Sequence, residues 1–264
     1  MDFEGVLSKM DTHLDEVVNY YLQFPRTFLH VNTLIDRNIH IKHIGYECLN
    51  CSKTKPVFRQ GFCYDCFMSS PAVGDWIMRP ELSKAHLDIE DRDLAYEKRI
   101  QLQPHVVYFA VASDLKIGVT RKTQIPTRWI DQGASYAFPI VELPNRYLAG
   151  ITEVALKNYF TDKTNWRKML TNQQADIDYK LSLHEVQRYL PEEILPYFEK
   201  TIHNKTDIKY PVLQYPTKLT SLNLTKTSEF SGKLKGIRGQ YLIFEDGCVF
   251  NVRSHEGFKI VLTT

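Results

Sequence analysis

Two sets of side chains in this sequence of 264 residues have the types and spacing that chemistry requires. The first is four cysteines arranged as two Cys-x2-Cys pairs: Cys48, Cys51, Cys63 and Cys66. The second lies within residues 105–168, where nine lysines and arginines outnumber five aspartates and glutamates. This segment has a formal charge of +4 in a chain of net charge +2, so positive charge is concentrated where an anion could be held.

The four cysteines predict a structural zinc site. Two residues between thiolates let both sulfurs of a pair face one ion, and two such pairs complete a tetrahedral Zn²⁺ site with no position left for water. The stretch VFRQGF, which contains Gly61, fits a hairpin carrying the second pair. Two unrelated reduced pairs, or a redox-active Cys-x2-Cys, are the alternatives. Cys248 lies in an apolar stretch and is expected to be an inert core residue.

The basic segment contains a set of side chains suited to hydrolysis of a phosphodiester: Tyr108, Lys116, Arg128 and Glu153. The reaction needs an activated water, a cation beside the phosphate and help for the leaving oxygen. Arg128 falls in the first turn of a helix that Pro126 is expected to start and Gly133 to end, so its guanidinium and free helix N–H groups would face one anion. Arg121 and Lys122 precede this helix and could bind neighbouring phosphates.

Glu153 could hold Mg²⁺ on a helical face that it shares with Ala149 and Gly150, whose small size would leave room for a hydrated ion. A cationic Lys116 would lower the pKa of Tyr108, so that the phenol could act as the base or orient the water. A neutral Lys116 could itself be the base. The alternative is purely structural, with Tyr108 a half-buried strand residue, a glycine that permits a turn, and Glu153 in an exposed i,i+4 pair worth ~0.3 kcal/mol.

The order of these residues resembles that of the GIY-YIG nuclease superfamily. VVY at 106–108 stands in the place of the first signature tripeptide and KIG at 116–118 in the place of the second. Arg128 and Glu153 match the superfamily's arginine and metal-binding glutamate, and Asn165 is a looser match. The resemblance implies a small mixed sheet flanked by helices, hydrolysis of nucleic acid, and a catalytic Mg²⁺ on Glu153.

The sequence also resembles, over nearly its whole length, an uncharacterised bacterial family that joins four zinc-ribbon cysteines to a β-rich tail. The shared segments are QPHVVY, TQIPTRWIDQGA, RYLAGITEVALK and DKTNWRKML. This second resemblance supports the domain layout and implies no activity of its own.

Patterns along the chain predict the elements that must position these side chains. Strands are predicted from VVNYYLQF and NIHIKHIGY, and later from HVVYFAV, LKIGVT and AFPIVEL, which enclose a short helix at PTRWIDQ. Ser182 and Glu185 predict a helix start, and Asp246-Gly247 predicts a hairpin. The clearest helix covers 145–160, and its expected apolar face is Tyr147, Leu148, Ile151, Val154, Ala155 and Tyr159.

We therefore predict an α+β protein with a structural zinc ribbon. The similar pentapeptides FEGVL at 3–7 and FSGKL at 230–234 leave open a sheet shared by the two ends of the chain. The expected parts are a β-rich N-terminal region at 1–47, the zinc ribbon at 48–70, a connector at 71–104, the GIY-YIG-like core at 105–172, a helical segment at 173–208, and a C-terminal β-meander or small barrel at 209–264.

The predicted function is a Mg²⁺-dependent endonuclease or phosphodiesterase that acts on nucleic acid, with DNA and RNA both open. A non-catalytic zinc-ribbon protein that binds nucleic acid is the alternative, and a protein-interaction scaffold is a third. No basic start followed by an apolar run is present, and no stretch approaches the ~20 apolar residues of a membrane helix, so a cytoplasmic protein without membrane contact is expected. The sequence does not indicate an oligomeric state.

Overall fold

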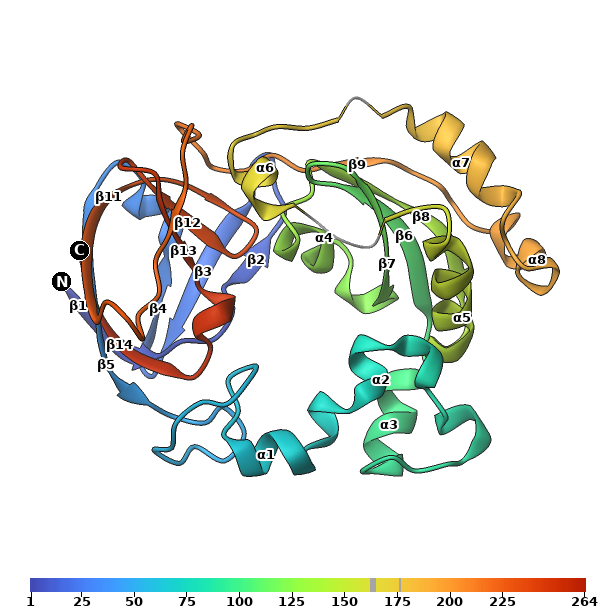
Figure 1. Cartoon of the computed structure of the whole chain (residues 1–264), viewed down its shortest axis with the longest axis horizontal. Helices are drawn as coiled ribbons and strands as arrows, with labels where there is room; N and C mark the ends of the chain where they lie inside the picture. Colours follow the sequence, from blue (N-terminus) through green and yellow to red (C-terminus); the bar gives the residue numbers. More distant parts are fainter. Residues whose placement is uncertain (162–164, 176) are drawn as a thin grey trace.

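A computed structural model describes residues 1–161, 165–175 and 177–264, which form an α+β protein with several sheets (Figure 1). The seven-stranded sheet has the order β1-β14-β5-β11-β12-β13-β10, and its neighbours are antiparallel except β10 and β13. It therefore joins both ends of the chain. Its strands are β1 (Asp2–Val6), β5 (Asn38–Tyr46), β10 (Thr220–Ser221), β11 (Glu229–Arg238), β12 (Tyr241–Phe244), β13 (Cys248–Asn251) and β14 (Phe258–Thr263).

Two smaller sheets complete the β structure of the described residues. The three-stranded sheet β2-β3-β4 packs beside the seven-stranded sheet, and we call these two together the terminal sheets. The four-stranded sheet has the order β7-β6-β8-β9 and is antiparallel throughout, where a mixed sheet was expected. The strands are β2 (Asp11–His13), β3 (Asn19–Phe24), β4 (Thr27–His30), β6 (His105–Val111), β7 (Leu115–Arg121), β8 (Tyr136–Leu143) and β9 (Thr206–Asp207).

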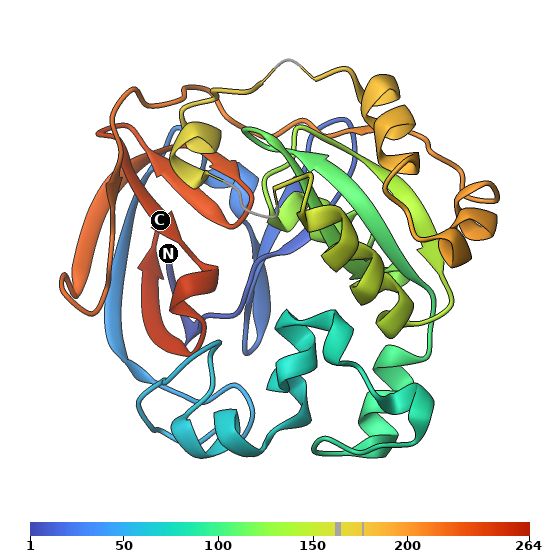
Figure 2. The ribbon, with the colours of Figure 1, turned by 45° about the vertical axis from the view of Figure 1, so that its right-hand side comes forward.

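Helices cover the four-stranded sheet and link it to the terminal sheets. Figures 1 and 2 both place α5 across one face of that sheet, with α7 and α8 beyond it, and show the segment from α1 to α3 running along the lower edge from the terminal sheets to the four-stranded sheet. The helices are α1 (Tyr64–Ser69), α2 (Asp75–Met78), α3 (Leu94–Gln101), α4 (Thr127–Asp131), α5 (Arg146–Lys157), α6 (Trp166–Leu170), α7 (Tyr179–Gln187) and α8 (Leu195–Phe198). No described helix has both the length and the apolarity needed to cross a bilayer.

The two faces of the four-stranded sheet belong to different apolar clusters, because successive strand side chains point to opposite faces. Val106, Tyr108 and Ala110 join α4 and the terminal sheets in one continuous cluster. Val107 and Phe109, on the other face, pack with α5, α7 and α8. The predicted core at 105–172 is thus buried on one side against the two ends of the chain.

The sequence patterns predicted where helices and strands lie along the chain better than they predicted which side of each element is buried. The hairpin at Asp246-Gly247 is confirmed, and Gly247 adopts the left-handed φ of 81° that such a turn favours. Helix α7 begins after Asp178, whose side chain accepts from two backbone N–H groups, so the start predicted at Ser182 was wrong. The expected apolar face of α5 was also wrong, because Val154 is exposed while Arg146 and Glu153 are buried.

Candidate functional site

Five positions singled out from the sequence line one hollow of about 180 Å³ at the β7 edge of the four-stranded sheet. This space corresponds to roughly six water molecules at their liquid volume. The hollow also borders α2 and the residues after it, through Ile77, Met78 and Pro80. The five positions are Tyr108 on β6, Lys116 and Gly118 on β7, Arg128 on α4 and Glu153 on α5.

Gly118 is needed for Tyr108 to reach the hollow from the neighbouring strand. The two residues are paired across β6 and β7, and a Cβ at Gly118 would lie 2.7 Å from Tyr108 Oη and 2.9 Å from its Cζ. The phenol therefore lies across the space that a side chain on β7 would fill. The structural alternative, in which Gly118 permits a turn, is wrong, because Gly118 lies inside β7.

Tyr108 is fully buried and protonated rather than activated. Its hydroxyl donates to Oε1 of Gln132 over 3.0 Å. Burial raises the pKa of Tyr108 above its usual value, although the nearby Arg128 guanidinium opposes this shift. The expected lowering of the Tyr108 pKa by Lys116 is therefore wrong, because the loss of solvent around the phenolate outweighs the neighbouring charge.

Arg128 is placed by contacts with the far end of the chain. Its helix begins after Pro126 and is followed by Gly133 at a φ of 70°, as the sequence predicted. The turn between β11 and β12 holds the end of this helix, because Arg238 Nε donates to Gly133 O over 3.0 Å and Gln240 Nε2 donates to Asp131 Oδ1 over 2.8 Å. Arg238 is 1% exposed, so this anchor is part of the core.

Glu153 is buried on α5, and its Oε2 lies 3.3 Å from the ammonium of Lys157. The carboxylate side chain is only 9% exposed, so the pair is not the solvated surface pair of the structural alternative. The sequence predicted that the small residues nearby would leave room for an ion, but they do not. A Cβ on Gly150 would lie 2.2 Å from the backbone nitrogen of Glu81, so this glycine lets the connector pack against α5.

A single carboxylate is a minimal site for Mg²⁺. Across the described residues, the one group of three or more cysteine, histidine or acidic side chains close enough to share a metal is the cysteine cluster. Glu153 fits Mg²⁺ only if water and substrate oxygens supply the remaining ligands, which this hard cation commonly accepts.

Arg146, at the start of α5, is a site residue that sequence reasoning missed. It is 9% exposed and lines the hollow beside Glu153. Its Nε donates to Trp76 O over 3.0 Å and its Nη2 to Ile77 O over 2.7 Å. The signal available in the sequence was helical spacing, because Arg146 is seven positions before Glu153 and therefore lies on the same side of α5.

The hollow adjoins a wider basic cleft of about 540 Å³ between the core, the connector and the terminal sheets. Val119, Arg128 and Arg146 line both spaces. Among the described residues that line either space, seven are lysine or arginine and two are acidic. The remaining cations of the cleft come from different parts of the chain and are Lys9, Arg121 and Arg253.

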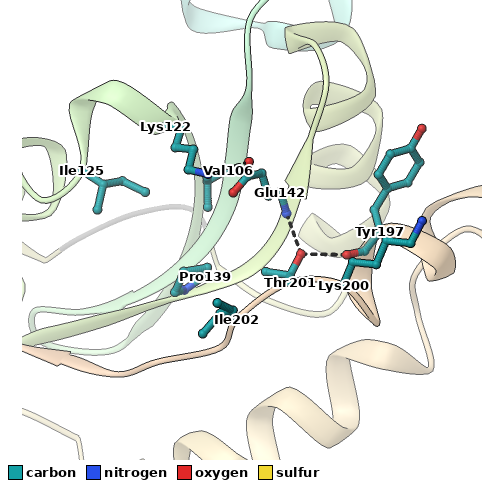
Figure 3. A pocket seen from close by; sticks show the side chains of 9 residues that line it. All are labelled: Val106, Lys122, Ile125, Pro139, Glu142, Tyr197, Lys200, Thr201 and Ile202. Carbon is teal, nitrogen blue, oxygen red and sulfur yellow. Dashed lines mark hydrogen bonds and ion pairs between the residues drawn. The ribbon is translucent and has the colours of Figure 1, made fainter.

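Arg121 and Lys122 were expected to bind neighbouring phosphates, but they diverge. Arg121 lines the basic cleft, whereas Lys122 pairs with Glu142 at 2.9 Å and lines a separate pocket of about 620 Å³. Figure 3 shows that pocket, where Thr201 links β8 to α8 by accepting from Glu142 N and donating to Tyr197 O. The exposed ion pair leaves Lys122 outside the site.

Asn165 also lies outside the residues that line the hollow and the cleft. Its side chain accepts from the backbone N–H groups of Arg167 and Lys168, so it caps α6. Trp129 on α4 is 2% exposed and packs beside Tyr108, so it is a core residue. Asp162, Lys163 and Thr164 of the shared segment before α6 lie outside the described residues.

The cysteine cluster has the geometry of a metal site. The sulfur atoms of Cys48, Cys51, Cys63 and Cys66 all lie within 4.8 Å of one another, and none forms a disulfide. Tetrahedral zinc with Zn–S bonds of about 2.3 Å holds its sulfurs roughly 3.8 Å apart, close to the 4.0 Å between Cys51 and Cys63.

The surroundings of the cluster suit thiolates. The backbone N–H of Cys63 donates to Cys48 Sγ over 3.3 Å, and the Asn50 amide donates to Cys66 Sγ over 3.4 Å. Donors aimed at sulfur stabilise its anionic form. The cluster can therefore hold a structural metal such as zinc, with no fifth protein ligand needed.

Cys248 is separate from this cluster and lies in β13. It is 7% exposed, and burial raises the pKa of its thiol to about 11. A thiol that stays protonated at neutral pH is a poor nucleophile. This agrees with its expected role as an inert core residue.

Residues 36–260 match the model of a family described as "Protein of unknown function (DUF2797)". Because the match covers most of the chain, the chain belongs to this family. No curated protein matches the chain, and no solved structure matches it.

Proposed function

We propose that this member of the DUF2797 family is a metal-dependent phosphodiesterase that cleaves nucleic acid, built on a GIY-YIG-like core and stapled by a structural zinc ion. One observation carries the proposal: the side chains of Tyr108, Lys116, Arg128 and Glu153, chosen from the sequence for phosphodiester chemistry, line the same small hollow. A small sheet with α4 packed on one face and α5 on the other supports the GIY-YIG-like assignment, while the antiparallel order of its strands departs from the mixed sheet that the resemblance implies.

Each side chain has a distinct role in this proposal. Arg128 binds the non-bridging oxygens of the scissile phosphate and offsets the charge that grows in the transition state. Tyr108, whose hydroxyl is fixed by Gln132, orients the attacking water as a neutral phenol. Lys116, 7% exposed at the edge of the hollow, is the remaining candidate for the base or for a second contact to the phosphate.

The proposed step is balanced hydrolysis. The water oxygen forms a bond to phosphorus, the bond from phosphorus to one ester oxygen breaks, and a proton lost by the water is transferred to that oxygen, which leaves as an alcohol. A Mg²⁺ on Glu153 would supply positive charge near that leaving oxygen. Binding Mg²⁺ requires Glu153 to exchange part of its contact with Lys157 for the ion.

Two observations favour a second candidate function, binding without cleavage. Tyr108 has a raised pKa, and Glu153 already has a cationic partner in Lys157. A hollow in which the acid is neutralised and the phenol is protonated can bind a phosphate without activating water. The basic cleft beside it would serve either function.

A cleavage assay with matched glutamate variants tests the proposal. Purified protein is incubated with Mg²⁺ and, separately, with supercoiled DNA, single-stranded DNA and RNA. Glu153→Gln is expected to lower the cleavage rate by about 100-fold or more, as loss of a transition-state contact usually does. Glu142→Gln is the control, because Glu142 also pairs with a lysine but lies in the separate pocket.

The outcomes separate the two candidates. Cleavage that depends on Glu153 but not on Glu142 supports the phosphodiesterase. Binding of nucleic acid without cleavage, unchanged by Glu153→Gln, supports the non-catalytic alternative. Absence of both activities on all three substrates would exclude each of them.

A further inference from the structure

We infer that the basic cleft is a second phosphate site, centred on Arg146 and Arg121, which holds a backbone phosphate next to the one in the hollow. The ligand is therefore a polynucleotide and not a mononucleotide or an isolated phosphodiester. This inference rests on the proposed function, since it names the substrate class of the same site.

Arg146 is a buried cation whose hydrogen-bond partners among the described residues are not carboxylates. Its two short hydrogen bonds go to neutral carbonyl groups, those of Trp76 and Ile77. Within the described part of the chain, it makes no ion pair within 4.0 Å, and Glu153 and Glu81 act on it only as more distant charges. Burial lowers its pKa to about 10, which shows how much solvation the guanidinium has lost.

An uncompensated buried charge is costly for a folded protein. A guanidinium has five N–H donors, and the two carbonyl bonds occupy two of them, which leaves three for a ligand. A phosphate oxygen pair matches that planar group and would restore the missing negative charge. The protein holds the group rigidly, because both acceptors belong to α2 and α2 is packed against α5 through the residues that follow it.

Arg121 adds a second cation of the same kind. It lines the cleft from the end of β7, is half-buried, and has no carboxylate within 4.0 Å among the described residues. Both guanidiniums act on the buried His105. Burial is the main reason that the pKa of His105 falls to about 4, and the positive charges of Arg146 and Arg121 lower it further. Arg121 and Arg146 both line the cleft, so two guanidiniums border the same space.

Two further cations of the cleft, Lys9 and Arg253, are already partly neutralised. Lys9 Nζ lies 2.9 Å from Asp131 Oδ2, and Arg253 Nη1 lies 4.0 Å from the same oxygen. Asp131 is 4% exposed in its side chain, so its charge is poorly screened by water. A phosphate would consequently bind nearer Arg146 and Arg121 than to the terminal sheets.

The cleft also continues directly into the hollow, since Arg128 and Arg146 line both. A ligand with one phosphate on Arg128 thus has a second cationic position within the same continuous space. A polymer of phosphodiesters can fill both positions at once, whereas a single phosphate can fill only one.

Binding measurements without cleavage test this inference. Fluorescence anisotropy of labelled short single-stranded DNA, duplex DNA and RNA is measured with Glu153→Gln protein, without added divalent cation and over a salt series. Adding Arg146→Met or Arg121→Met is expected to weaken binding about tenfold and to reduce the salt slope by about one. Arg253→Gln is expected to have a smaller effect, and Arg188→Met, at the residue that follows α7, is the control.

The variants also guard against a simple failure to fold. Arg146→Met removes two hydrogen bonds to α2, but Arg121→Met removes none that the described residues make, so its fold should persist. Binding of all three probes that is unchanged in both variants, or changed equally by Arg188→Met, would overturn the inference. The probe that loses most affinity identifies the preferred polymer.

The proposed function can fail separately. If wild-type protein with Mg²⁺ cleaves nothing but binding still depends on Arg146 and Arg121, the second phosphate site stands and the phosphodiesterase does not. If the protein cleaves bis(4-nitrophenyl) phosphate and polynucleotides with rates that Arg146→Met and Arg121→Met leave unchanged, the second site is refuted and the phosphodiesterase stands.

Discussion

Substituting Gly118 with alanine should destabilise the protein by forcing its methyl group into Tyr108. The new Cβ would lie 2.7 Å from the phenolic oxygen and 2.9 Å from Cζ, both shorter than ordinary van der Waals contact. Tyr108 is fully buried and its hydroxyl is bonded to Gln132, so displacing the ring would disturb both its packing and this hydrogen bond. Overpacking of this kind typically costs about 1–3 kcal/mol.

Two smaller effects act in opposite directions. A displaced phenol would lose its hydrogen bond to Gln132, worth about 1 kcal/mol. Alanine in a strand recovers about 0.5–1 kcal/mol relative to glycine, because the unfolded chain has less freedom to lose. The net expectation for Gly118→Ala is a loss of about 1–3 kcal/mol of unfolding free energy, or a melting temperature roughly 3–10 °C lower.

A double-mutant cycle with Tyr108→Phe, measured by urea denaturation, tests the cause. Removing the hydroxyl relieves the 2.7 Å contact but leaves the one to Cζ, so Gly118→Ala should cost about 1 kcal/mol less in the phenylalanine background. Equal costs in both backgrounds would refute the contact as the reason for the glycine. Stabilisation by Gly118→Ala in the wild type would refute it as well.

Two further predictions concern metal removal and pH. Purified protein should contain one zinc per chain by elemental analysis. Cys51→Ser should lower both the zinc content and the melting temperature, because the cluster has no other described cysteine or histidine to replace the lost ligand. Full zinc retention in this variant would exclude the four-sulfur site. Acidification should destabilise the fold through His105, whose pKa falls from 6.5 in the unfolded chain to about 4 in the folded protein. Because the unfolded state binds the proton more tightly, stability is complete above pH 6.5 and falls by about 1.4 kcal/mol per pH unit as the pH drops toward 4. Urea midpoints at several pH values should show a shallower fall for His105→Gln, and an identical fall in both proteins would contradict the assignment.

Local features could be predicted because they depend on residues close together in the chain. The spacing of Cys48, Cys51, Cys63 and Cys66 predicted that the two Cys-x2-Cys pairs form one cluster, as they do. Arg59 and Phe62 form the bridge of the hairpin that was expected to carry the second pair. The alternation of strands and helix at 105–142 was likewise visible, because strand propensity and turn chemistry act over a few residues.

The faces of elements were harder to predict, since burial of a polar side chain depends on its partners. Apolar periodicity assigned α5 a face that includes Val154, whereas the folded helix buries Arg146, Thr152 and Glu153. A buried charged residue violates the pattern on which the prediction rests, and such violations concentrate at functional sites. The same limit applies to Arg121 and Lys122, which are adjacent in sequence but line different spaces.

The sequence by itself determined which chemical groups this protein carries: four cysteines spaced so that they can hold a metal, a run of strands with a short helix, and a tyrosine, a lysine, an arginine and a glutamate in the order that phosphodiester hydrolysis suggested. Only the tertiary structure decided that α4 is held by Arg238 and Gln240 from the far end of the chain, and that the connector places Arg146 beside the hollow. The physical reason is that the spacing of residues along the chain is fixed by covalent geometry. Which distant charged side chains come together depends instead on which apolar faces share a core and on which carbonyl groups can accept from a buried guanidinium.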